Sequence, residues 1–176
     1  MGFKRAAGLG ALTLAVAAAV TGAGADAAYA AGATPELLPV PKSATYQDGA
    51  LTLSKVELVG TDVADADAVR EVKELLSAAG IQVTERTAEQ GATKGATAIY
   101  LTEADDTCSA RDAAATAMGL ADVAGLDEEG YVLGVDAASK TIVLTGASGD
   151  GSYYAAQTLA QLIEGKDVPN ARISDE

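Results

Sequence analysis

Apolar residues recur at steps of three and four in two segments of the chain, a spacing that places them on one face of an α-helix. The first segment is residues 64–79, and its stripe consists of Val69, Val72, Leu75, Leu76 and Ala79. The second begins near Ser152 and ends at Gly165, and its stripe consists of Ala156, Leu159, Ala160 and Ile163. A third, shorter helix is expected over residues 112–118.

Strand-like runs occupy much of the remaining chain. Residues 131–135 and 141–145 are apolar and are separated by five residues, which predicts a β-hairpin. Residues 43–54 also predict a hairpin, with its turn at Gln47, Asp48 and Gly49. Single strands are expected at residues 55–59, 81–85, 98–101 and 171–174.

The two long helices determine the predicted architecture. Each has one apolar stripe and one polar face, so each can pack on one side only. A mixed β-sheet with the helices packed on one face buries both stripes and one face of the sheet. We therefore predict an α+β fold, a two-layer sandwich, over residues 42–176, preceded by an extended linker at residues 31–41 that carries Pro35, Pro39 and Pro41.

The first thirty residues have the three parts of a bacterial secretory signal peptide. Lys4 and Arg5 supply the positive end, residues 6–20 are uncharged, and a region of small residues ends in Ala-Tyr-Ala at Ala30. Cleavage after Ala27 is an alternative, and a permanent membrane anchor is the rival interpretation. The apolar run is shorter than the ~20 residues that a spanning helix needs, which favours the cleaved signal and a secreted, extracellular protein.

Charge and composition exclude several functional classes. The net charge of −13 argues against nucleic acid and anionic membranes as partners, because both bind clustered Lys and Arg. The chain has no His and one cysteine, Cys108, so it cannot form a Ser-His-Asp triad, a Cys-His pair or an internal disulfide. Cys108 is expected to be a small, half-buried side chain. The sequence indicates no cofactor and no metal site.

Three polar segments invite a catalytic or binding interpretation. The glycine-rich turn at residues 146–151 precedes a helix, but it lacks the Lys of a phosphate-binding loop, so we expect a tight turn with Asp150 or Ser152 capping the helix. Asp105 and Asp106 are adjacent carboxylates, and residues 127–129 form a second acidic run. Such pairs can serve glycoside hydrolysis or loose calcium binding, but their polar surroundings predict solvated side chains.

Tyrosines are the remaining candidates for contact with a ligand or partner. Tyr131, Tyr153 and Tyr154 lie around the last hairpin and helix. An exposed tyrosine ring can stack on a sugar, but more often such rings cover the edge of a core or an interface. Adjacent helical residues point about 100° apart, so Tyr153 and Tyr154 cannot both face the apolar stripe. We expect one ring to pack inward and the other to lie near the surface, as an interdomain or sugar contact.

The same region carries a family resemblance. Residues 128–169 resemble the end of the small N-terminal domain that precedes the catalytic barrel in bacterial β-N-acetylhexosaminidases. That pattern has Glu-Gly-Tyr at the start of a hairpin, a glycine turn, a Tyr at the helix start, then Gln-Thr-Leu and Gln-Leu. Here the residues are Glu129, Gly130 and Tyr131, then Gly151 and Tyr154, then Gln157, Thr158, Leu159, Gln161 and Leu162. Ala155 stands where the family usually has Gly.

The resemblance extends over about residues 37–174 and includes "LLPVPKSATY", "KVELVG" and "GIQVT". Glycoside hydrolase families 20 and 84 share this domain, and residues 59–76 look more like family 84, the hyaluronidase and O-GlcNAcase-like enzymes. In those enzymes a (β/α)₈ barrel follows and carries a substrate-assisted reaction, in which the sugar's own N-acetyl oxygen attacks with help from a carboxylate pair.

The resemblance therefore implies an accessory domain of a secreted β-N-acetylglucosaminidase that docks to a barrel, in cis or in trans. These 176 residues end at Glu176, before the position of a barrel. No catalytic residue of the family has a matching position here, so none is assigned, and the chain alone is not expected to catalyse. N-acetylglucosamine-containing glycans are the implied substrate class. A stand-alone carbohydrate-binding module and an inactive remnant are the alternatives.

We expect export to remove residues 1–30, because the three-part signal ends in an Ala-x-Ala motif at Ala30. Mass spectrometry of the secreted product should find Ala31 as its first residue. An intact Met1 in the membrane fraction would show that the segment is an anchor.

Overall fold

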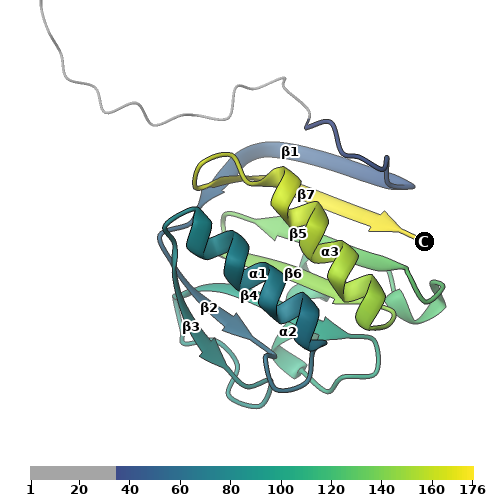
Figure 1. Cartoon of the computed structure of the whole chain (residues 1–176), viewed down its shortest axis with the longest axis horizontal. Coiled ribbons are helices and arrows are strands. Elements are labelled where there is room, and N and C mark those ends of the chain that lie inside the picture. The colour runs from purple at the N-terminus through teal and green to yellow at the C-terminus, as the bar shows by residue number, and fades with distance from the viewer. Residues whose placement is uncertain (1–34) are drawn as a thin grey trace, which may run out of the picture.

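The computed structural model describes residues 35–176, which form one mixed seven-stranded β-sheet with helices on both faces (Figure 1). The strand order is β1-β7-β5-β6-β4-β2-β3, with parallel pairing from β6 to β3 and antiparallel pairing from β1 to β6. The predicted α+β class and mixed sheet are confirmed. The strands are β1 (Ser43–Thr52), β2 (Lys55–Val59), β3 (Gln82–Arg86), β4 (Thr97–Glu103), β5 (Tyr131–Asp136), β6 (Thr141–Gly146) and β7 (Asp167–Asp175).

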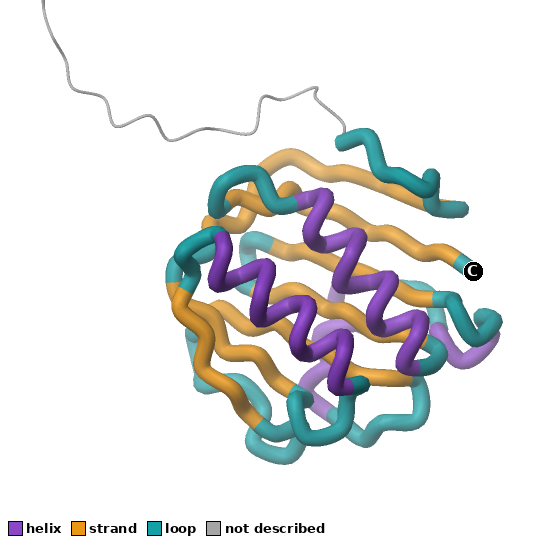
Figure 2. The backbone as a smooth tube through the Cα atoms, in the orientation of Figure 1, coloured by secondary structure: helices purple, strands orange, loops and turns teal. Residues whose placement is uncertain are grey.

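The two long helices, α1 (Ala66–Ala78) and α3 (Gly149–Leu162), lie side by side on one face of the sheet, as predicted (Figure 2). The main core lies between them and the sheet. Val72 and Leu76 of α1 and Leu159 of α3 are fully buried there. The strands contribute alternate residues to the same core, among them Ile99, Leu101, Leu133, Ile142 and Leu144.

The short helix α2 (Ser109–Met118) packs on the opposite face, which the two-layer prediction left uncovered (Figure 2). The other set of alternate strand residues forms a smaller cluster with it, including Ala98, Tyr100 and Val143. The cause lies in the central strands β4 and β6, which are apolar on both faces and therefore need cover on both.

The N-terminal hairpin prediction was wrong. Residues 43–52 are the single strand β1, which pairs with β7 along its length. Gln47, Asp48 and Gly49 form a bulge in that strand, where the register shifts between Tyr46 and Ala50. Gly49, one of the residues that suggested a turn, adopts a positive φ of 96° in this bulge. Asn170 Nδ2 donates to the Asp48 carbonyl oxygen at 2.8 Å. Pairing with β7, distant in the sequence, therefore replaced local pairing.

The cap of α3 also differs from the prediction. Ser148 is the N-cap, and its Oγ accepts a hydrogen bond from the backbone N–H of Asp150 at 3.2 Å. Ser152, one of the two predicted caps, is fully buried in the first turn and donates to the carbonyl oxygen of Thr102 at 3.0 Å. The helix thus begins inside the glycine-rich turn.

The sequence predicted a signal peptide at residues 1–30 and an extended linker at residues 31–41. The signal peptide lies outside the described residues. The last part of the predicted linker, residues 35–41, has no regular structure, yet it contacts the domain, because Leu37 is buried in the main core. No helix within residues 35–176 is both long enough and apolar enough to span a membrane.

We expect Gly151→Ala to destabilise the fold by about 1–3 kcal/mol, the usual effect of overpacking. A β-carbon at Gly151 would lie 2.2 Å from the carbonyl oxygen of Gly130, and neither backbone can move freely. Urea unfolding monitored by circular dichroism measures the change. Gly125→Ala is the matched control, because nothing lies within 4 Å of its added β-carbon. Equal stability of the two variants would contradict the proposed close packing.

Candidate functional site

Tyr131 forms the floor of the candidate site. It begins β5, its side chain is only 5% exposed, and its hydroxyl lies 2.7 Å from Thr158 Oγ1 of α3. Burial raises the pKa of the Tyr131 hydroxyl, although the Thr158 hydrogen bond opposes that rise. The ring therefore packs in the core, and its hydroxyl joins the sheet to α3.

Tyr153 and Tyr154 point in different directions from the first turns of α3. Tyr153 is half-buried against the main core, and its hydroxyl accepts a hydrogen bond from Gln157 Nε2 at 3.1 Å. Tyr154 is 41% exposed. The two rings meet edge to face, with centroids 6.0 Å apart. One ring packs inward and the other stays at the surface, which agrees with the expectation from helical geometry.

A groove of about 420 Å³ joins two of these tyrosines to both ends of the described chain. Its residues come from three places: the exposed side of α3, the N-terminal segment, and the end of β7 with the loop before β5. We call this cavity the α3 groove. It is lined by Leu38, Pro39, Glu129, Tyr131, Tyr154, Gln157, Thr158, Gln161, Asp175 and Glu176.

The N-terminal wall of the α3 groove is held by Gln161. Its Oε1 accepts a hydrogen bond from the Leu38 N–H at 2.8 Å, and its Nε2 donates to the Leu38 carbonyl oxygen at 3.0 Å. The side-chain amide thus satisfies both backbone groups of Leu38, as a neighbouring strand would. The Leu38 side chain remains 67% exposed beside the groove.

Carboxylates dominate the charge of the α3 groove. Glu129, Asp175 and Glu176 line it, and its lining residues include no Lys or Arg. Lys42, near its rim, forms an ion pair with Glu176, and the Lys42 backbone N–H donates to Asp175 Oδ1 at 3.0 Å. The groove therefore offers mainly hydrogen-bond acceptors to a ligand or partner.

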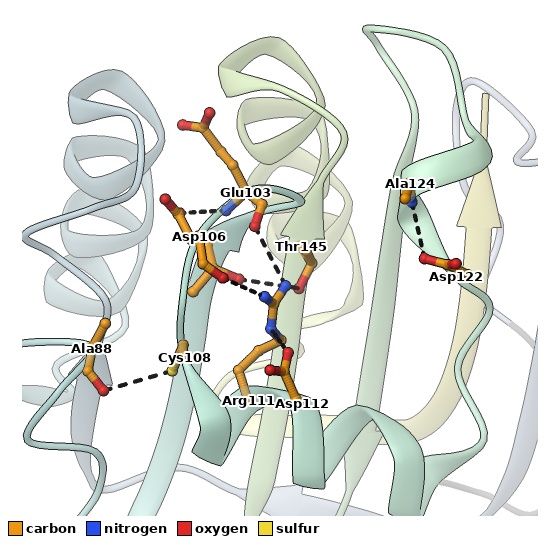
Figure 3. A network of polar contacts seen from close by, with 10 residues as sticks. Ala88, Glu103, Asp106, Cys108, Arg111, Asp112, Asp122, Ala124 and Thr145 are labelled. Atoms are coloured by element: carbon orange, nitrogen blue, oxygen red, sulfur yellow. Dashed lines mark hydrogen bonds and ion pairs between the residues drawn. The ribbon is translucent and has the colours of Figure 1, made fainter.

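A second polar cluster lies around Arg111 of α2, close to the carboxyl ends of β4 and β6 (Figure 3). Arg111 is 6% exposed and donates to the carbonyl oxygens of Asp106 and Glu103 at 2.9 and 3.4 Å. It also donates to Thr145 Oγ1 at 3.4 Å, and its Nε lies 2.7 Å from Asp112 Oδ1 without hydrogen-bond geometry. These contacts fix α2 and the preceding loop to the sheet.

The acidic residues near Arg111 serve the backbone. Asp106 Oδ2 accepts a hydrogen bond from the Glu103 N–H at 2.7 Å and so closes the loop after β4. The Glu103 carboxylate turns away from the guanidinium of Arg111 (Figure 3). Its pKa is raised mainly by burial, and the nearby carboxylates of Asp106, Asp65 and Asp105 add to the rise. This arrangement fits a loop of defined geometry better than an acid–base pair.

Neither Cys108 nor a cluster of metal ligands forms a site within residues 35–176. Cys108 is 1% exposed, more buried than expected, and its Sγ lies 3.8 Å from the carbonyl oxygen of Ala88. Within residues 35–176 no group of three or more Cys, Asp or Glu side chains is arranged to hold a metal ion.

Several residues of these sites were not predicted from the sequence to belong to a site, among them Gln157, Gln161 and Arg111. Gln157 and Gln161 belong to the resembling motif, and their spacing from Tyr154 places all three on one helix face, which is a usable signal. Arg111 gave no signal, because the predicted helix began after it at residue 112, whereas α2 begins at Ser109. Tyr131, Tyr153 and Tyr154 were all singled out, and the structure brings Tyr131 and Tyr154 to the same groove.

Comparison with known proteins finds relatives of this chain and of its fold. Residues 34–176 match the model of glycosyl hydrolase family 20, domain 2. Among solved structures, CpGH84D is similar with a TM-score of 0.68 and 20% identity, over 82% of this chain and 24% of that one. The β-N-acetylhexosaminidase from Bacteroides fragilis NCTC 9343 gives a TM-score of 0.54 and 21% identity, over 78% and 23%.

A family 20 β-N-acetylglucosaminidase is also similar, with a TM-score of 0.50 and 24% identity over 81% of this chain and 22% of that one. At these identities the structures demonstrate a common fold. The chain spans about a quarter of the length of the solved proteins that it matches.

We expect the Tyr131–Thr158 pair to couple the sheet to α3. Tyr131→Phe and Thr158→Val should each lower the free energy of unfolding by about 1–2 kcal/mol, because each leaves a buried hydroxyl without its partner. The double variant should lose about 1 kcal/mol less than the sum. Denaturant unfolding of the four proteins closes the cycle. Tyr153→Phe is the control, because Tyr153 is only partly buried; this variant should change the free energy of unfolding by less than about 0.5 kcal/mol. Strict additivity of the Tyr131 and Thr158 variants would refute the coupling.

Proposed function

The chain belongs to the domain family called glycosyl hydrolase family 20, domain 2, and we propose that it is an accessory domain of a secreted β-N-acetylglucosaminidase. In this proposal the domain precedes and docks to a catalytic (β/α)₈ barrel, which lies outside these 176 residues and is supplied in cis or in trans. The substrates of the whole enzyme are N-acetylglucosamine-containing glycans. The observation that carries the proposal is the family match over residues 34–176.

The parent enzyme is proposed to be of the family 84 type. CpGH84D and CpGH84B give TM-scores of 0.68 and 0.66, higher than the 0.50 of the family 20 β-N-acetylglucosaminidase. Residues 59–76 favour the same assignment. The fold is common to both families, so this choice bears on the parent enzyme and leaves the role of the domain unchanged.

The chemistry of the described residues supports an accessory role. Hydrolysis by paired carboxylates needs one acid with a raised pKa beside a second, ionised carboxylate in a substrate pocket. Asp106 instead closes a loop through the Glu103 N–H, and the Glu103 carboxylate lies beside the start of α1. The α3 groove holds carboxylates, but two of them, Asp175 and Glu176, contact Lys42.

We expect the mature chain, residues 31–176, to hydrolyse no aryl N-acetylglucosaminide. Turnover above a buffer blank, measured by release of the aryl group, tests this. Activity that disappears in Asp105→Asn or Asp106→Asn would contradict the proposal and assign catalysis to this acidic loop.

The alternative, a stand-alone carbohydrate-binding module, rests on the exposed ring of Tyr154. A single ring without Trp makes a weak platform for a sugar. Calorimetric titration with chitin oligomers and hyaluronan distinguishes the two functions. Dissociation constants weaker than about 100 µM, roughly −5.5 kcal/mol, agree with the accessory role. Tighter binding that is lost in Tyr154→Ala would establish the binding module instead.

A further inference from the structure

Two of the large apolar side chains that are exposed within residues 35–176 line the α3 groove. Leu38, Val40 and Tyr154 are 67%, 78% and 41% exposed, and Val63, at 36%, is the remaining large apolar residue with comparable exposure within residues 35–176. Leu38 and Tyr154 line the α3 groove, and Val40 follows one wall of it. A cluster of this kind, rimmed by polar residues, is typical of a protein–protein contact.

Several hydrogen-bond acceptors of the same groove have few or no donors among the described residues. Glu129 is exposed and forms no hydrogen bond or ion pair with any described residue. Gln157 Nε2 donates to the Tyr153 hydroxyl, and Gln157 Oε1 accepts no hydrogen bond from residues 35–176. Asp175 accepts one backbone hydrogen bond through Oδ1. A partner that fills the groove must supply hydrogen-bond donors and positive charge.

We propose that the α3 groove binds an arginine side chain of a partner protein, with its guanidinium over the exposed ring of Tyr154. A guanidinium is planar, always charged, and carries five N–H donors, so it can stack on a ring and donate to carboxylates at once. Glu129 and Asp175 supply the carboxylates, and Gln157 supplies a neutral acceptor. The exposed side chain of Leu38 covers the aliphatic part of the arginine or an apolar neighbour.

Other occupants fit the groove less well. A lysine ammonium is a strongly hydrated point charge that stacks less favourably on a ring. A sugar needs donors as well as acceptors, and the lining supplies mainly acceptors. The identity of the partner as the catalytic barrel rests on the proposed function, whereas the preference of the groove for arginine rests on the groove alone.

The test titrates N-acetyl-arginine amide into the ¹⁵N-labelled mature chain and follows amide chemical shifts by NMR. Residues around the α3 groove should shift, with a dissociation constant on the order of a few millimolar. N-acetyl-citrulline amide is the matched ligand control, because it has nearly the same shape without the charge. It should leave the spectrum unchanged at the same concentration.

Variants separate groove binding from general attraction to an acidic protein. Glu129→Gln and Tyr154→Leu should each weaken arginine binding by about threefold, the effect of one exposed ion pair or one cation–π contact. Glu89→Gln is the matched control, since Glu89 is an exposed loop carboxylate distant from the groove lining. It should bind arginine as the unchanged chain does.

The proposal is overturned if shifts spread evenly over the acidic surface, if citrulline binds equally, or if Glu129→Gln and Glu89→Gln behave alike. It is also overturned if a chitin tetramer, and not arginine, shifts the groove residues, or if concentration-dependent shifts show that a second copy of the chain fills it. These results are independent of the hydrolysis assay. Arginine binding can therefore be refuted while the accessory role stands, and the accessory role can be refuted while arginine binding stands.

Discussion

Close backbone packing where α3 meets the sheet determines the position of the candidate site. Gly151 lies against the carbonyl of Gly130, and a β-carbon on Gly146 would lie 2.1 Å from the Ser152 nitrogen. No other residue type fits these positions without moving backbone. The first turn of α3 is thereby fixed across the start of β5 and the end of β6. The hydroxyl pair of Tyr131 and Thr158 holds the third turn of α3 to β5.

That placement of α3 determines which side chains face outward. Tyr154, Gln157 and Gln161 line the α3 groove together with the N-terminal segment and the end of β7. In Figure 1, β7 lies on the side of α3 opposite α1. Gln161 then holds Leu38 by both of its backbone groups. The residues of the resembling motif therefore have two roles: Gly130, Gly151 and Thr158 set the packing, and Tyr154, Gln157 and Gln161 form the surface.

The buried charge of Arg111 has a structural role, unlike the exposed carboxylates of the α3 groove. Its guanidinium satisfies the carbonyls of a loop and the hydroxyl of Thr145, and so holds α2 against the second face of the sheet (Figure 3). The carboxylates that most suggested catalysis, Asp105 and Asp106, belong to this loop. Asp106 completes a turn through the N–H of Glu103, which is a structural role.

The sequence by itself determined most of the elements and the class of the fold, because helical stripes and apolar strand runs are local patterns that any buried packing must satisfy. It also identified Tyr131 and Tyr154, and helical geometry alone required one of the adjacent tyrosines to remain outside. Only the tertiary structure decided that residues 43–52 form one bulged strand, that α2 covers the second face, and that Ser148 caps α3. Each of these depends on a partner distant in the sequence. The strand at residues 43–52 pairs with β7, and α2 packs in one cluster with Val143. Ser148 Oγ donates to the carbonyl oxygen of Glu128 at 2.7 Å. The α3 groove is of the same kind, since its walls lie more than a hundred residues apart in the chain and meet only when the sheet has formed.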